Sequence, residues 1–229
     1  MAHASTKSEQ SHALCSAVCR KRGRPRDEAL HCRRCEEILC QSIEVFARLG
    51  YRNTDVQLIA DPLRIAKGTI YRYFPSKEKL FLAAVERGVR QLDVYIHVAV
   101  DREGDPLRKI VVAVKAYLEF FDSHPELVEL FVQERSEFRD RHKPIYFQVG
   151  EENEAVWRAM IQGLIDSGRL RHMPAERVKR VMGGVLYGTM FTNYLTNRQI
   201  PAEQQARDIV DVVFNGLLGD KERSEFATR

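Results

Sequence analysis

The sequence contains no cysteine after residue 40. The five that come earlier are Cys15, Cys19, Cys32, Cys35 and Cys40. An odd number of cysteines at one end of a chain argues against a disulfide framework. Their spacing resembles a zinc pattern, but the second pair falls inside the helical pattern EALHCRRCEEILCQSIEVFARLG, whereas structural zinc sites usually place such a pair on a turn. We therefore expect neither a metal site nor a cofactor, and a thiol-sensing role stays open as an alternative.

Long apolar runs are also absent. The best candidate, VMGGVLYGTMFTNYL, is shorter than the roughly 20 residues that cross a membrane and contains an asparagine. The apolar stretch HALCSAVC precedes its positively charged run, which is the reverse of the order in a secretory signal. We therefore expect a cytoplasmic protein with no membrane partner.

The common catalytic motifs are missing as well. The sequence has no G-x-S-x-G nucleophile elbow, no H-E-x-x-H zinc motif and no Walker phosphate loop. An enzyme would need one of these or an equivalent set of nucleophile, acid and base. We therefore expect that the protein is not an enzyme.

Charge is distributed unevenly along the chain. Among 229 residues, 44% are hydrophobic and 30% are charged, which is typical of a folded globular protein. The first 80 residues hold 15 Lys and Arg against 9 Asp and Glu, whereas the remainder holds 21 against 23. A basic N-terminal part indicates a polyanionic partner, nucleic acid or an anionic membrane face, and the alternative is a solvated head.

The N-terminal part divides into an arm and several helices. Residues 1–26 are polar and without periodicity, so we expect a flexible basic arm. An apolar stripe predicts a first helix over residues 27–49, ended by Gly50. Thr54 and Gln57 have the spacing of a capping box, which predicts the start of a second helix.

Prolines set the limits of the next helices. Pro62 ends the second helix near Leu63, and Pro75 ends a third helix formed by IAKGTIYRYF. Ser76 caps a fourth helix that begins KEKLFLAAVERGVRQL. Two short helices about three residues apart, packed on a longer one, are the helix-turn-helix arrangement. We therefore predict a helix-turn-helix DNA-binding domain over residues 27–80.

The third helix has the composition of a recognition helix. Small residues let the backbone approach the major groove, and a lysine there reaches a base edge or a phosphate, while tyrosine and arginine supply donors for phosphates. Ile65, Ile70 and Phe74 recur at the spacing that faces a core. A tyrosine beside such a face is also often half-buried. The predicted DNA contacts on this helix are Lys67, Gly68, Thr69, Tyr71, Arg72 and Tyr73.

The segment GYRNTDVQLIADPLRIAKGTIYRYFPSKEKLF, from Gly50 to Phe81, closely resembles the TetR family of bacterial transcriptional regulators. The resemblance implies an all-α homodimer with a three-helix DNA-binding head and a larger helical body for ligand binding and dimerisation. It implies a ligand-responsive regulator of transcription, a repressor that leaves a palindromic operator when a small-molecule effector binds. It also implies phosphate contacts by Thr54, Tyr71, Tyr73 and Lys77, and Lys77 lies at a helix start, which favours phosphate.

Two residues depart from the family pattern. Arg64 stands where the family has a turn glycine, and it would carry a steric cost in a left-handed conformation. Pro62 stands where the family has an ordinary helical residue. Either the turn is rebuilt or the head is less stable, so a helical protein-interaction or thiol-sensing regulator with weakened DNA binding is the alternative function.

The arm has a motif of its own. KRGRPR resembles the AT-hook core, which lies extended in narrow A·T minor grooves. Arg24 and Arg26 are therefore predicted to contact DNA. A basic tail with only non-specific attraction is the alternative.

Residues 81–229 have helical patterns throughout, which predicts a regulatory and dimerisation body. The last helix has a broad apolar stripe and the helix before it has three glycines, Gly183, Gly184 and Gly188. By resemblance these two helices form the dimer, and the alternative is that the stripe is intramolecular core. The candidate pocket residues, which could equally be core, are Tyr117, Phe121, Phe131, Trp157, Met160 and Phe191.

Overall fold

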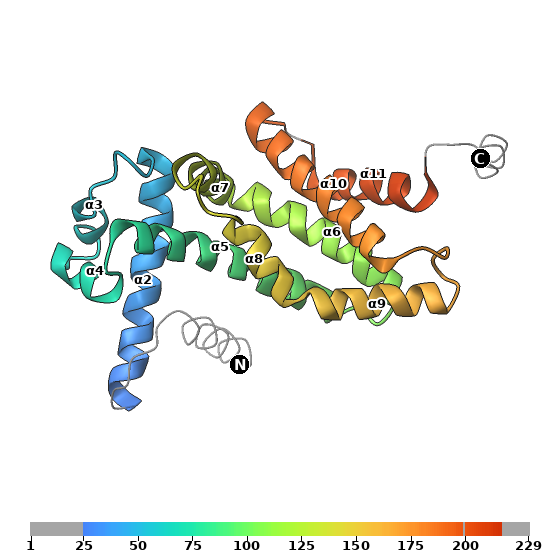
Figure 1. The fold of residues 1–229 in the computed structure, drawn as a ribbon, viewed down its shortest axis with the longest axis horizontal. Helices are drawn as coiled ribbons and strands as arrows, with labels where there is room; N and C mark the ends of the chain where they lie inside the picture. The colour runs from blue at the N-terminus through green and yellow to red at the C-terminus, as the bar shows by residue number, and fades with distance from the viewer. Residues whose placement is uncertain (1–24, 199, 217–229) are drawn as a thin grey trace. The chain divides into compact units, whose positions relative to one another are not determined.

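The computed structural model describes residues 25–198 and 200–216, with side chains from residue 29 onward. Every regular element in these ranges is an α-helix (Figure 1), as the sequence predicts. The helices are α2 (Pro25–Leu49), α3 (Gln57–Ala60), α4 (Lys67–Tyr73), α5 (Lys77–Val100), α6 (Pro106–Ser123), α7 (Pro125–Glu137), α8 (Ile145–Glu152), α9 (Glu154–Asp166), α10 (Ala175–Thr196) and α11 (Ala202–Asn215). None of them is long and apolar enough to cross a membrane.

The chain divides into two compact units. The first contains residues up to 93 together with 124–153, and the second contains 94–123 together with the residues from 154 onward. The sequence predicted an arm over residues 1–26, a DNA-binding domain over 27–80 and a helical body over 81–229. In the structure α7 and α8 belong to the same compact unit as α2, α3 and α4, and α7 packs directly on α2.

The helix α2 is the central helix of the first unit. Its apolar stripe is buried, with Ile38 and Phe46 fully inaccessible. The helix begins at Pro25, two residues before the predicted start. Proline is favoured in the first turn of a helix because the backbone N–H that it lacks would have no partner within the helix there. The last helical residue is Leu49. Gly50 follows in a left-handed conformation with φ 81°, and its N–H donates to the Phe46 carbonyl at 2.9 Å.

The helix α3 does not begin with the predicted capping box, and that prediction is wrong. The Thr54 hydroxyl donates back to the Gly50 carbonyl at 2.7 Å, and α3 begins after Val56 without a side-chain cap from Thr54. The Asp55 carboxylate accepts the Gln57 N–H at 2.8 Å instead. Aspartate makes this bond to the backbone two residues on without leaving the turn.

The turn between α3 and α4 has a left-handed residue although it contains no glycine. Arg64 has φ 53°, its N–H donates to the Asp61 carbonyl, and the Ile65 N–H donates to the Ala60 carbonyl at 3.2 Å. These bonds close α3 after four residues, before the predicted end near Leu63. Arg64 therefore carries the steric cost that a glycine would avoid.

The helix α7 packs closely on α2 and α5. The Gln133 amide donates to the Phe46 carbonyl at 2.9 Å. Gly88 on α5 permits the approach of Leu127, because a Cβ there would lie 2.3 Å from Leu127 Cδ2. Phe138, just after α7, contacts the rings of Tyr51 and Phe81. The head thus shares its core with α7.

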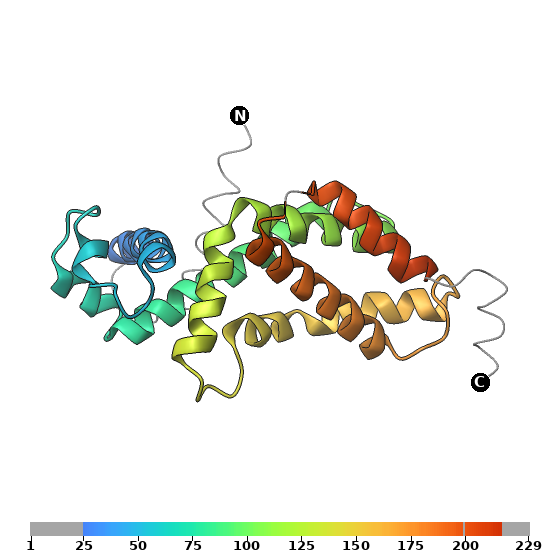
Figure 2. The same ribbon diagram turned by 90° about the horizontal axis from the view of Figure 1, so that it is seen from above.

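The second unit is built from α6, α9, α10 and α11 with the end of α5. Figure 2 shows α11, in red, running alongside α6, in green, in agreement with their extensive contact. Leu118 and Phe120 of α6 are fully buried, and the Tyr117 hydroxyl lies 3.6 Å from the Met190 sulfur on α10. The predicted helical segments are present, whereas α8 was not predicted as a separate helix from α9.

Candidate nucleic-acid interface

The helix α4 has an inner and an outer face. Ile70 and Phe74 are buried against the head, as their spacing predicts. Gly68 and Tyr71 lie on the exposed side, and a Cβ added at Gly68 would meet no atom within 4 Å. A short helix with a small residue and hydroxyl and basic side chains on its outer face is suited to enter a major groove.

Lys67, at the start of α4, forms an ion pair with Asp55. Its Nζ lies 2.6 Å from Asp55 Oδ1, and the two side chains are 39% and 59% exposed. The bond to the Gln57 backbone N–H and the bond to Lys67 lower the pKa of Asp55, and the bond to Asp55 raises the pKa of Lys67. The ammonium predicted to read a base is therefore paired with a carboxylate across the helix-turn-helix. Sequence reasoning missed Asp55, although an aspartate two residues before a helix start signals a capping role.

Thr54 and Lys77 hold the loop that precedes α3. Thr54 is only 2% exposed and its hydroxyl is bonded to Gly50. The Lys77 ammonium donates to the Thr54 carbonyl at 3.1 Å and the Arg52 carbonyl at 3.2 Å, and it lies 4.7 Å from the centre of the Tyr51 ring. Both residues thus have structural partners within the head, and their phosphate contacts stay predictions.

The remaining predicted contacts differ in exposure. Arg72 is exposed, whereas Thr69 and Tyr73 are half-buried. The Tyr73 ring lies edge-on to His31 of α2, with centroids 4.5 Å apart. Arg24 lies outside the described residues. Arg26 belongs to the first turn of α2, so its backbone is helical there rather than part of an extended arm.

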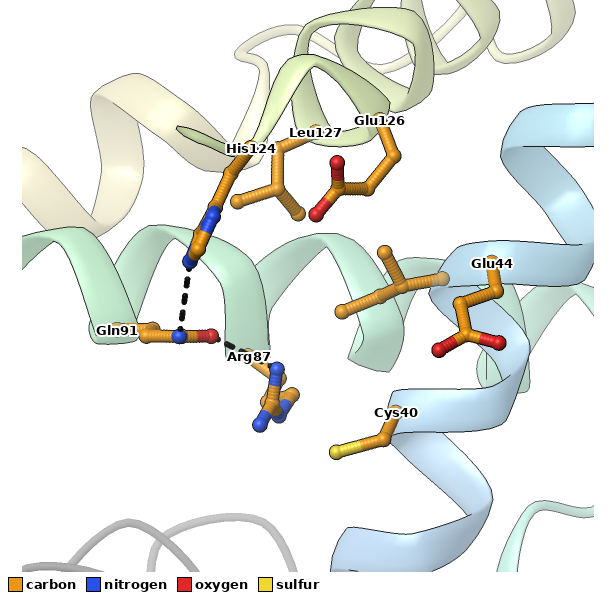
Figure 3. A pocket seen from close by; sticks show the side chains of 8 residues that line it. Cys40, Glu44, Arg87, Gln91, His124, Glu126 and Leu127 are labelled. Carbon is orange, nitrogen blue, oxygen red and sulfur yellow. Dashed lines mark hydrogen bonds between the residues drawn. The ribbon is translucent and has the colours of Figure 1, made fainter. Parts of the chain in front are cut away.

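A hollow of about 150 Å³ lies within the first unit, among α2, α5 and the start of α7 (Figure 3). Gln91 Oε1 accepts from the Arg87 guanidinium at 2.8 Å, Gln91 Nε2 lies 3.2 Å from His124 Nε2, and Arg87 is paired with Glu36 at 2.7 Å. The Cys40 side chain points into this space.

Burial raises the pKa of the Cys40 thiol. The form that reacts with oxidants is the thiolate, so this environment does not activate the thiol. Cys35 is buried and Cys32 is half-buried, both on α2 as the helical pattern predicts. Cys15 and Cys19 lie outside the described residues. Among the three described cysteines the geometry shows no activated thiol, and the alternative of a thiol-sensing regulator stays open.

The predicted effector residues do not all belong to one unit. Phe131 lies in the first unit, where its ring contacts Tyr146, and the others lie in the second. Tyr117 and Phe121 are buried neighbours on α6, with ring centroids 5.0 Å apart. Trp157, Met160 and Phe191 are half-buried.

The three helices α2, α3 and α4, with the outward face of α4, define a helix-turn-helix DNA-binding domain. Residues 38–84 match the family model described as bacterial regulatory proteins, tetR family. The predicted resemblance to this family is thereby confirmed over the helix-turn-helix domain.

Three individual proteins illustrate how similar the chain is to known regulators. The HTH-type transcriptional regulator YerO of Bacillus subtilis (strain 168) is 29% identical over 126 residues, which cover 54% of this chain and 44% of that protein. The HTH-type transcriptional regulator LuxR of Vibrio harveyi is 22% identical over 166 residues, 72% of this chain and 80% of that protein. The transcriptional regulator FadR from Bacillus subtilis, solved in complex with stearoyl-CoA, has the same fold: its TM-score is 0.69 at 15% identity, with 80% of this chain and 99% of that chain covered.

Proposed function

We propose that the protein is a ligand-responsive transcriptional repressor that binds a palindromic operator as a homodimer and leaves it when a small-molecule effector binds. The observation that carries this proposal is the outward face of α4. Gly68, Tyr71 and Arg72 are exposed there, while Ile70 and Phe74 anchor the same helix in the core. Lys67 is expected to reach a base edge, and the tyrosines are expected to reach phosphates.

The dimer is supported by apolar surface on α10 and α11. Within α10 only Ala175 and Met190 are buried, although the helix is rich in apolar residues. Leu195 is 70% exposed, and Val212 and Phe214 on α11 are also exposed. The apolar stripe predicted on the last helix is therefore only partly buried within one chain. A second copy of the same two helices is the partner that would cover it, by a twofold contact.

The effector is expected to bind among α6, α9 and α10. The support for a ligand there is the fold alone, which this chain shares with FadR. FadR is solved with stearoyl-CoA, so a long-chain acyl-CoA is the first compound to test. Release of the protein from its DNA by a titrated acyl-CoA, and not by free coenzyme A, is the expected result.

The test of the DNA-binding role uses Gly68. A Cβ added there would meet no atom within 4 Å, so the fold should tolerate a leucine, but the leucine side chain would stand between α4 and a groove. The operator would first be selected from random duplexes. Gly68→Leu should then reduce affinity at least about tenfold, the effect of about 1.4 kcal/mol, by fluorescence anisotropy.

The matched control is Gly150→Leu, at an exposed glycine of α8 that also has open space. It should leave DNA affinity unchanged. Equal affinities of wild type and Gly68→Leu for the selected duplex would contradict the proposed role of α4.

A further inference from the structure

The pair of Asp55 and Lys67 places a negative charge on the face proposed to meet DNA. The two residues are twelve positions apart and come from the two sides of the helix-turn-helix. Asp55 is held in place twice, by the Gln57 backbone N–H at 2.8 Å and by the Lys67 ammonium at 2.6 Å. Both side chains stay accessible to a ligand, so DNA would meet a neutral pair rather than a lysine alone.

This neutral pair has different consequences on different DNA. Non-specific binding depends on lysines and arginines that meet phosphates, and an ammonium held by a carboxylate adds nothing to that attraction. To reach a phosphate, Lys67 must leave Asp55, and the carboxylate then faces the phosphate backbone unpaired. A guanine edge aligned with Lys67 on the correct site presents two acceptors, O6 and N7, so it offsets the loss of the Asp55 bond better than a phosphate oxygen does.

We infer that Asp55 is a specificity-determining residue, which weakens binding to incorrect DNA by pairing with Lys67. The inference rests on the proposed function, because it names a residue that tunes the same interface. Specificity is a difference between two affinities, and a repulsive element increases it when it acts more strongly on the wrong partner. Asp55 acts through Lys67 and is therefore a positioning residue.

The test compares Asp55→Asn with the wild type on the selected duplex and on a scrambled duplex of equal length, at several salt concentrations. Asparagine caps a helix as well as aspartate does, so the bond to Gln57 is retained. Asp55→Asn should tighten binding to the scrambled duplex by about fivefold and make its salt slope steeper by about one. Binding to the selected duplex should tighten less, so the ratio of the two affinities should fall by about threefold or more.

Two further variants make the test selective. Asp61→Asn removes the same charge from the same head but from a carboxylate that bonds the Gln57 side chain, and it should change both affinities equally. In a Lys67→Met background, Asp55→Asn should leave the ratio of affinities unchanged. Asp55→Ser, which also caps, repeats the measurement if the asparagine variant has reduced helicity.

Several outcomes overturn the inference. The first is that Asp55→Asn tightens binding to both duplexes equally. The second is that Asp61→Asn lowers the ratio of the two affinities as much as Asp55→Asn does. The third is that Asp55→Asn still lowers this ratio in the Lys67→Met background. The proposed function fails differently: a wild type with no salt-dependent duplex binding would contradict it, and the role of Asp55 with it.

Discussion

The Lys77 ammonium donates a hydrogen bond to the Thr54 carbonyl at 3.1 Å, which ties the start of α5 to the loop before α3. The same ammonium also bonds the Arg52 carbonyl and lies over the Tyr51 ring. The family resemblance assigned Lys77 a phosphate contact alone. Its position gives it a structural role that does not depend on DNA.

Lys77→Ala is therefore expected to lower the free energy of unfolding by about 1 to 3 kcal/mol, since two carbonyls lose a charged donor. Urea denaturation followed by circular dichroism measures the change. The control Lys79→Ala removes the same charge from an exposed position of α5 and should stay within about 0.5 kcal/mol of wild type.

The phosphate contact predicted for Lys77 leads to a separate prediction about DNA affinity. Lys77→Ala should weaken all duplexes to about the same extent and lower the salt slope by about one. A destabilised variant with an unchanged salt slope would contradict the phosphate contact and leave the structural role in place.

Arg64→Gly is expected to stabilise the protein. The left-handed conformation costs an ordinary residue about 1 to 2 kcal/mol, and glycine avoids this cost. Glycine also loses more backbone entropy on folding, which lowers the gain in stability by about 0.5 to 1 kcal/mol. The net gain should be about 0.5 to 1 kcal/mol, seen as a higher melting temperature. Arg64→Ala removes the charge but keeps the φ of 53°, so it should show no such gain. A melting temperature below that of wild type for the glycine variant would contradict the strain.

Glu134 should make stability depend on pH. It is 2% exposed, its carboxylate accepts the Ile145 N–H at 3.0 Å and lies 3.6 Å from the Arg141 guanidinium, and burial raises its pKa. A carboxyl whose folded pKa is above its unfolded pKa contributes stability at pH values below the unfolded pKa. That contribution is lost as the pH rises through the folded pKa.

The free energy of unfolding of the wild type, compared with that of Glu134→Gln at the same pH, should therefore fall as the pH rises from about 4 toward neutrality. The glutamine retains an acceptor for Ile145. Urea denaturation at several pH values measures the difference. A constant difference between wild type and Glu134→Gln over this range would rule out the raised pKa.

Gly184→Glu should separate the proposed dimer. A Cβ added at Gly184 would meet no atom within 4 Å, so the monomer should fold, but the carboxylate of a glutamate would enter the surface expected to be covered by the second copy. Light scattering should show a dimer for wild type and a monomer for the variant. Gly163→Glu, at an exposed glycine of α9, is the control and should stay dimeric. A dimeric Gly184→Glu protein would place the interface elsewhere.

The local features of the fold were predictable from the sequence. Proline and glycine act on their own backbone, so the ends of helices at Gly50 and before Pro75 could be read without tertiary information. The inward side of α4 followed from helical periodicity, because Ile70 and Phe74 recur one turn apart. The family match rested on the same short segment.

The tertiary structure alone decided the partners of the polar groups. Thr54 had the spacing of a capping residue, yet its hydroxyl bonds Gly50 because the loop folds back on itself. The pairing of Lys67 with Asp55 depends on how the turn at Arg64 brings α4 back beside the start of α3. Apart from α8, the sequence determined which segments are helical, since that depends on neighbouring residues. Which carboxylate meets which ammonium depends on residues that only chain folding brings together, and a pattern of spacing contains no information about it.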